Sequence, residues 1–189
     1  MSIIDSTINK TLRLNDMNGS GTTGKYSRGI VTIHWMSAFL IFILFPLGKY
    51  MSGLDPIEKL GLIKFHGILG LIIFLLTIAR SVLFFTTKRP EKLNTGSWFN
   101  DLIAMVIHRA FYILLLLIGV SGIVTLVLGG YLDAISIEST NLILPRDEIS
   151  PLLIHNMLAV LLIALLAVHV AGVIRFNIKH KTNAIKRMT

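Results

Sequence analysis

The chain contains no cysteine and few charged residues, and each shortage excludes a class of protein. Without cysteine there are no disulfides, no thiolate-bound iron–sulfur clusters and no haem attached through a C-x-x-C-H motif. Only 15% of the 189 residues are charged, whereas 53% are hydrophobic. Soluble domains have a larger charged share and a smaller apolar one. The composition therefore indicates a membrane protein, with too few loop residues for a soluble domain beside the membrane part.

The apolar segments also lack a period-two alternation of apolar and polar residues, which argues against the strands of a membrane β-barrel. Four of these segments are long enough for a helix to cross the roughly 30 Å hydrocarbon layer. They comprise residues 30–51, 65–85, 103–128 and 151–176. We predict an all-α fold, a membrane four-helix bundle with four transmembrane helices. The longest connection, 129–150, has room for a short surface helix.

The first 24 residues differ from the rest of the chain. Residues 1–24 are rich in Asn, Ser, Thr and Gly and have no sustained apolar run, so we predict a flexible N-terminal extension rather than a signal peptide. Residues 25–189 then form a single predicted transmembrane domain.

Lysine and arginine are distributed unevenly around the predicted spans. All but four of the 18 fall on the side that holds both termini, and the exceptions are Lys49, Lys59, Lys64 and Arg146. Because cytoplasmic loops carry an excess of these residues, the pattern predicts both termini in the cytoplasm. Their spread around apolar segments indicates topology and a lipid bilayer partner, and no nucleic acid, despite the net charge of +8. The opposite side is net acidic, with Asp55, Glu58, Asp133, Glu138, Asp147 and Glu148.

Five of the six histidines fall inside or at the ends of the predicted spans, where an ionisable residue is costly and indicates function. They are His34, His66, His108, His155 and His169. His155 and His169 share one face of a helix and are separated by about 21 Å along its axis. The alternating directions of the helices then place His66 near His155, and both His34 and His108 near His169. Each layer of the bundle therefore holds a histidine pair.

Histidine pairs from facing helices, without Cys or carboxylate partners, favour axial ligation of haem iron. Zinc would normally recruit Cys or carboxylate ligands as well. Small residues that permit a close approach lie beside the rings: Gly67, Gly70, Ala167, Ala171 and Gly172. Two stacked haems need four ligands, so His108 either replaces His34 opposite His169 or lies beside a haem propionate or a quinone headgroup. A single histidine inside the membrane could instead form only a hydrogen bond to a neighbouring helix. Histidines that occur in pairs favour the binding of haem iron.

Four motifs resemble the bacterial cytochrome b561 family of di-haem b membrane proteins, which includes superoxide oxidase. The motifs are "KYSRGIVTIHW", "KFHGILGLIIFLLTIAR", "HRAFYILLLLIGVSGIV" and "IHNMLAVLLIALLAVHVAGVI". The likeness covers residues 25–188. It implies two haem b groups, with the iron of the cytoplasmic-side haem bound by His34 and His169 and that of the outer haem by His66 and His155.

The same resemblance leaves His108 near a site for ubiquinone. Arg28, Arg80 and Arg109 lie at the depth where haem propionates would emerge, and their charge suits pairing with carboxylates. The alternative for each arginine is snorkelling at the bilayer edge. On the outer side, Lys49, Lys59 and Lys64 could form a local positive patch that attracts a small anion, although that side as a whole is acidic.

The resemblance implies a multi-pass protein of the bacterial inner (plasma) membrane that carries electrons across the bilayer to ubiquinone, an oxidoreductase with superoxide as its donor. A second interpretation is a membrane anchor and electron relay for a separate periplasmic dehydrogenase or cytochrome, docked on the acidic 129–150 loop. A third is a haem-free transporter or channel with histidines as proton relays. The lack of broken-helix signatures disfavours this last interpretation.

Overall fold

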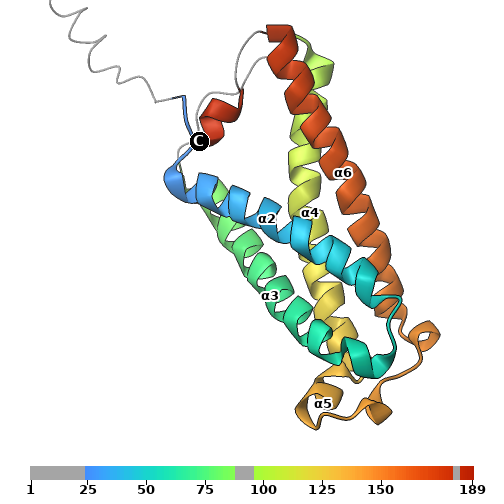
Figure 1. Cartoon of the computed structure of the whole chain (residues 1–189). Coiled ribbons are helices and arrows are strands. Elements are labelled where there is room, and N and C mark those ends of the chain that lie inside the picture. The colour runs from blue at the N-terminus through green and yellow to red at the C-terminus, as the bar shows by residue number, and fades with distance from the viewer. Residues whose placement is uncertain (1–23, 88–95, 181–183) are drawn as a thin grey trace, which may run out of the picture.

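Four long helices dominate the computed structural model, which describes residues 24–87, 96–180 and 184–189 (Figure 1). The helices are α2 (Arg28–Met51), α3 (Pro56–Thr86), α4 (Trp98–Leu128) and α6 (Ser150–His180). Each is apolar and long enough to cross a membrane, and the described residues contain no strand. The predicted all-α membrane bundle of four helices is therefore confirmed. The extension predicted over 1–24 lies, apart from Gly24, outside the described residues.

The helices extend beyond the apolar segments of the sequence. α3 has 31 residues, so it is roughly 46 Å long and exceeds the hydrocarbon layer. It begins at Pro56 because Asp55 has an extended backbone at the N-cap and proline is favoured in the first helical turn. The added turns carry Glu58, Lys59 and Lys64, which suit the membrane surface. Hydropathy alone places the start of this helix too late, at residue 65.

The bundle is built from two packed pairs of helices. α4 packs along α6, α2 packs against α3, and the contact between α3 and α4 joins the pairs. Figure 1 shows α2 inclined to α6 rather than parallel to it. The buried core comprises Leu40, Ile41, Ile73, Leu114 and Leu162. Along α6, Leu162 lies between His155 and His169, so apolar packing separates the two histidine layers. Many other large apolar side chains are exposed, as a lipid-facing surface requires.

The connection between α4 and α6 contains the short helix that the sequence predicts, α5 (Tyr131–Ser136), followed by two 3-10 turns, η1 (Thr140–Leu142) and η2 (Arg146–Glu148). Gly130 has a φ of 71°, and a Cβ there would collide with the carbonyl oxygen of Leu142. Arg146 Nη1 donates a hydrogen bond of 3.2 Å to the carbonyl oxygen of Ser52. The loop is therefore anchored to the turn between α2 and α3.

The last described residues return to the start of α2. There, η3 (Ala184–Met188) forms hydrogen bonds with Trp35 and Tyr26. Trp35 Nε1 donates to the carbonyl oxygen of Met188 at 2.7 Å, and the Tyr26 amide donates to that of Arg187 at 3.1 Å. The C-terminus and the N-terminal end of α2 thus lie at the same end of the bundle (Figure 1). The cytoplasmic orientation of that end stays a prediction.

We expect the Trp35→Phe substitution to loosen this C-terminal segment. The variant keeps the aromatic ring but loses the donor to the Met188 carbonyl, which costs about 1 kcal/mol in free energy of unfolding. Thermal unfolding in detergent and limited proteolysis of the C-terminus measure the effect. Trp98→Phe is the matched control, because Trp98 is 77% exposed. Equal protease resistance of the two variants would show that the bond does not hold η3.

Candidate cofactor-binding site

The first histidine pair joins α3 to α6. The ring centroids of His66 and His155 are 6.2 Å apart, with an angle of 71° between the ring planes. Both side chains are partly buried. The structure thus places His66 near His155, as the alternating helix directions predict.

His155 is oriented by two oxygen atoms of α4. Its Nδ1 lies 3.0 Å from the carbonyl oxygen of Ile118 and 3.2 Å from Ser121 Oγ. A carbonyl oxygen only accepts hydrogen bonds, so Nδ1 carries the ring proton. The lone pair of Nε2 is therefore free for a metal. Sequence analysis missed Ser121, although it lies within the "GVSG" run opposite a predicted ligand.

Two glycines that sequence analysis did not single out accommodate these rings. A Cβ at Gly122 would lie 3.1 Å from His155 Cε1, and one at Gly48 would lie 3.5 Å from His66 Cε1. At Gly70 and Gly172 a Cβ meets no atom within 4 Å, so no neighbouring helix comes close there, and the approach of a porphyrin face stays a prediction. At Gly67 a Cβ would be 3.3 Å from Leu126, which fits the prediction. Hydropathy does not reveal which glycines on a helix face a ring.

The second pair joins α4 to α6. The rings of His108 and His169 have centroids 5.2 Å apart and are nearly perpendicular. Phe111 packs edge-on against the same His169 ring at 5.4 Å. His108 Nδ1 is bonded to the carbonyl oxygen of Ala104 one turn earlier, so its proton is on Nδ1 and its Nε2 is free. His108 itself is exposed.

His34 has a different partner. Its Nδ1 lies 3.1 Å from Arg80 Nη1, and because a guanidinium only donates, this nitrogen accepts and the ring proton is on Nε2. Arg80 also lies over the Tyr112 ring, 5.7 Å from its centroid. His34 is close enough to His108 and His169 for electrostatic interaction with both. The structure therefore places His108 directly against His169, whereas His34 contacts Arg80 and interacts with the other two rings through electrostatics.

The three candidate arginines differ in their surroundings. Arg28 and Arg109 are exposed, whereas Arg80 lies within the histidine layer. Arg80 Nε is buried and has no hydrogen-bonding partner. A buried donor without an acceptor is costly, which is the situation that a haem propionate would relieve.

The donor set fits haem better than a metal ion bound by protein alone. Among the described residues, no group of three or more His, Asp or Glu side chains could hold a metal ion. A metal–imidazole bond is about 2 Å long and the ring centre lies about 1 Å farther, so two axial rings have centroids about 6 Å apart. The 6.2 Å between His66 and His155 fits this value, whereas the 5.2 Å between His108 and His169 is shorter.

Two surface grooves have no histidine among their lining residues. One, of about 540 Å³, is lined by Ala171, Ile174, Arg175, Ile178 and Lys179 of α6. The other, of about 260 Å³, lies between α4 and α6 and has only apolar lining residues. Neither contains a predicted ligand.

A family model described as prokaryotic cytochrome b561 matches residues 25–189, which is most of the chain. No match was found among curated proteins or among solved structures.

We expect Gly122→Ala to disturb His155, because the added Cβ would press on a ring that is already tied to α4. The purified variant should bind less haem per protein than the wild type. The haem-to-protein ratio measures this loss. Gly61→Ala is the control, since a Cβ there meets nothing within 4 Å. Full haem content in Gly122→Ala would contradict the close packing of His155.

Proposed function

The chain belongs to the prokaryotic cytochrome b561 family, and from this premise we propose that it is a di-haem b cytochrome of the bacterial inner membrane that reduces ubiquinone. Family membership makes it a haem b electron-transfer protein that spans the membrane several times. The proposal adds the number of haems, the direction of electron flow and the acceptor. The observation that supports it most is the arrangement of histidines in two layers, both served by α6.

His66 and His155 are the proposed ligands of the outer haem. Their spacing suits an iron atom between the rings, and the proton on His155 Nδ1 leaves Nε2 to bind it. When bound, haem b accepts and donates single electrons. The chain supplies the ligands and an apolar surrounding, which together tune the haem potential.

His34 and His169 are the proposed ligands of the cytoplasmic-side haem. For His34 to ligate, Arg80 must release the Nδ1 atom of that ring. The unpartnered Nε of Arg80 supports this change, because a propionate would offer the guanidinium a stronger acceptor than an imidazole. Arg80 is therefore the best supported propionate partner, ahead of the exposed Arg28 and Arg109.

His108 is the alternative ligand opposite His169. The bond from its Nδ1 to Ala104 favours this alternative, because it leaves Nε2 for iron, whereas the 5.2 Å between the His108 and His169 ring centroids is shorter than an iron atom between them requires. If His34 is the ligand, the free Nε2 of His108 can take up a proton and pass it to a ubiquinone headgroup. Its exposure supports that second role, because a quinone enters from the lipid.

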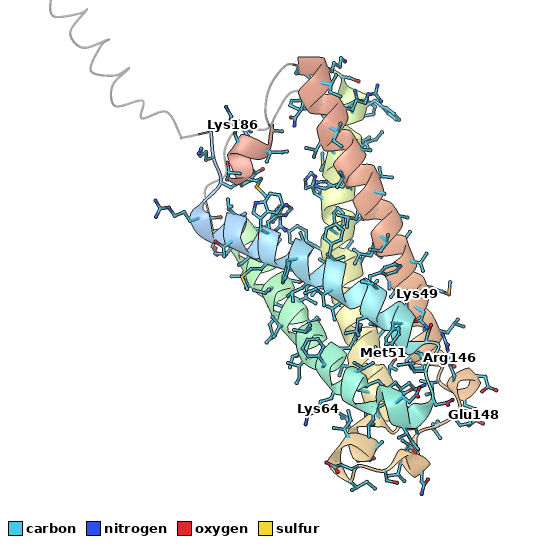
Figure 2. The ribbon with its side chains drawn as sticks, in the orientation of Figure 1. Lys49, Met51, Lys64, Arg146, Glu148 and Lys186 are labelled. Carbon is cyan, nitrogen blue, oxygen red and sulfur yellow. The ribbon has the colours of Figure 1, made fainter. Side chains whose placement is uncertain are left out.

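Superoxide is the proposed donor when the protein acts alone. Two superoxide anions give one electron each and leave as dioxygen, and ubiquinone takes up two electrons and two protons to form ubiquinol. Lys49 and Lys64 are exposed on α2 and α3 near the end of the bundle that carries α5 (Figure 2). Their charges would attract a small anion locally.

A separate protein donor is the second candidate. The loop between α4 and α6 exposes Asp133, Glu138, Asp147 and Glu148, a charge pattern that suits a basic redox protein. The chain would then relay electrons from this partner.

We expect His34→Ala to lose one of two haems, whereas His108→Ala should keep both and reduce ubiquinone more slowly. The first change would remove a proposed iron ligand, and the second would remove the ring proposed to serve the quinone. Haem content and reduced-minus-oxidised spectra of the purified variants measure the difference. Loss of a haem in His108→Ala, with both haems kept in His34→Ala, would make His108 the ligand.

We expect superoxide to reduce both haems of the purified protein, and a ubiquinone analogue to reoxidise them. Stopped-flow spectra at the haem α-band measure both steps. Superoxide dismutase added beforehand serves as the control, because it removes the donor. Haems that superoxide leaves oxidised would contradict the stand-alone activity and favour the relay.

A further inference from the structure

We propose that Ser121 of α4 is a positioning residue that adds a second acceptor to the Nδ1 proton of His155, beside the Ile118 carbonyl, and thereby lowers the reduction potential of the outer haem. The inference rests on the proposed function, in which His155 is an iron ligand. It deepens that function by naming the group that tunes the ligand.

The hydrogen bonds around His155 Nδ1 permit one consistent placement of protons. Ser121 Oγ lies 3.0 Å from the carbonyl oxygen of Ile118 and 3.2 Å from His155 Nδ1, and the same carbonyl lies 3.0 Å from Nδ1. The Ser121 hydroxyl donates to the carbonyl, and the Nδ1 proton is shared between both oxygens. If Ser121 donated to Nδ1 instead, that nitrogen would face the carbonyl without a proton.

These hydrogen bonds at Nδ1 affect Nε2, the nitrogen on the opposite side of the His155 ring. With the proton held on Nδ1, Nε2 keeps the lone pair that binds iron. Acceptors on Nδ1–H also increase the electron density of the imidazole, which makes it a stronger ligand and favours the oxidised iron. Ser121 is 9% exposed, so water does not readily substitute for its hydroxyl.

His66, the other proposed ligand of this haem, lacks a comparable hydrogen bond. His66 Nδ1 is buried and has no hydrogen-bonding partner. Among the described residues, hydrogen bonding to the proposed ligands of this haem therefore acts through His155, and Ser121 is the side chain that takes part in it. Gly122 allows the ring to approach α4, since a Cβ there would press against it.

Thr125 provides a matched control on the same helix. It is also buried, at 7% exposure, and its hydroxyl donates to the carbonyl oxygen of Ser121 at 2.8 Å. It makes no hydrogen bond to His155. Removal of the Thr125 hydroxyl therefore shows how far the loss of any buried hydroxyl from α4 changes the haem potentials.

The experiment compares Ser121→Ala with Thr125→Val in the full-length, haem-loaded protein. We expect Ser121→Ala to raise the midpoint potential of one haem in a spectroscopic redox titration and to leave the other unchanged. The affinity of that site for haem should fall about 10-fold, the lower end of the range for outer-shell partners, because the Ile118 carbonyl remains. Thr125→Val should move neither potential, and Ser121→Thr should restore the wild-type value.

Unchanged potentials in a folded Ser121→Ala protein would overturn the proposal. If Ser121→Ala does not fold, Ser121→Cys decides instead, because its sulfur is a weak acceptor and should give a smaller shift of the same sign. Unchanged potentials in Ser121→Cys would then overturn the proposal. Failure of the proposed function has a separate signature, since His155→Ala would retain both haems.

Discussion

An imidazole inside an apolar bundle has two ring nitrogens, and the partner of one decides what the other can do. When Nδ1 donates to an oxygen, Nε2 is left with a lone pair that can bind iron. His155 meets this condition through Ile118 and Ser121, and His108 meets it through its own helix at Ala104. In His34, the contact with Arg80 gives the opposite tautomer. In these three rings, the hydrogen-bond partner of Nδ1 is thus the constraint on which the proposed haem chemistry depends.

The pairing of α4 with α6 connects this constraint to the fold. α6 carries His155 and His169 on one face, and α4 supplies partners at both levels: Ser121 at the first and His108 at the second. These two helices also pack together more extensively than any other pair among the described elements. Rigid helices hold a ligand more precisely than loops do. α2 and α3 then complete the layers with His34 and His66.

The sequence predicts the four helices and the layers of histidines because both follow from simple periodicities. Hydropathy locates the spans, and the fourteen-residue spacing of His155 and His169 gives their shared face. The choice between His34 and His108 cannot be predicted this way, because it depends on how helices rotate and cross. The contacts of Ser121 and Gly122 with His155 could not be predicted for the same reason. Serine and glycine are common in membrane helices, and only the packing of α4 against α6 brings them to His155.

The central claim is that the chain holds two haems between histidines of facing helices. Low-temperature EPR of the oxidised protein, combined with the haem-to-protein ratio, tests it most directly in the wild type, His155→Ala and His169→Ala. The account predicts two low-spin signals in the wild type and the loss of a different signal in each variant. A wild-type protein with a single haem, or the loss of the same signal in both variants, would contradict it.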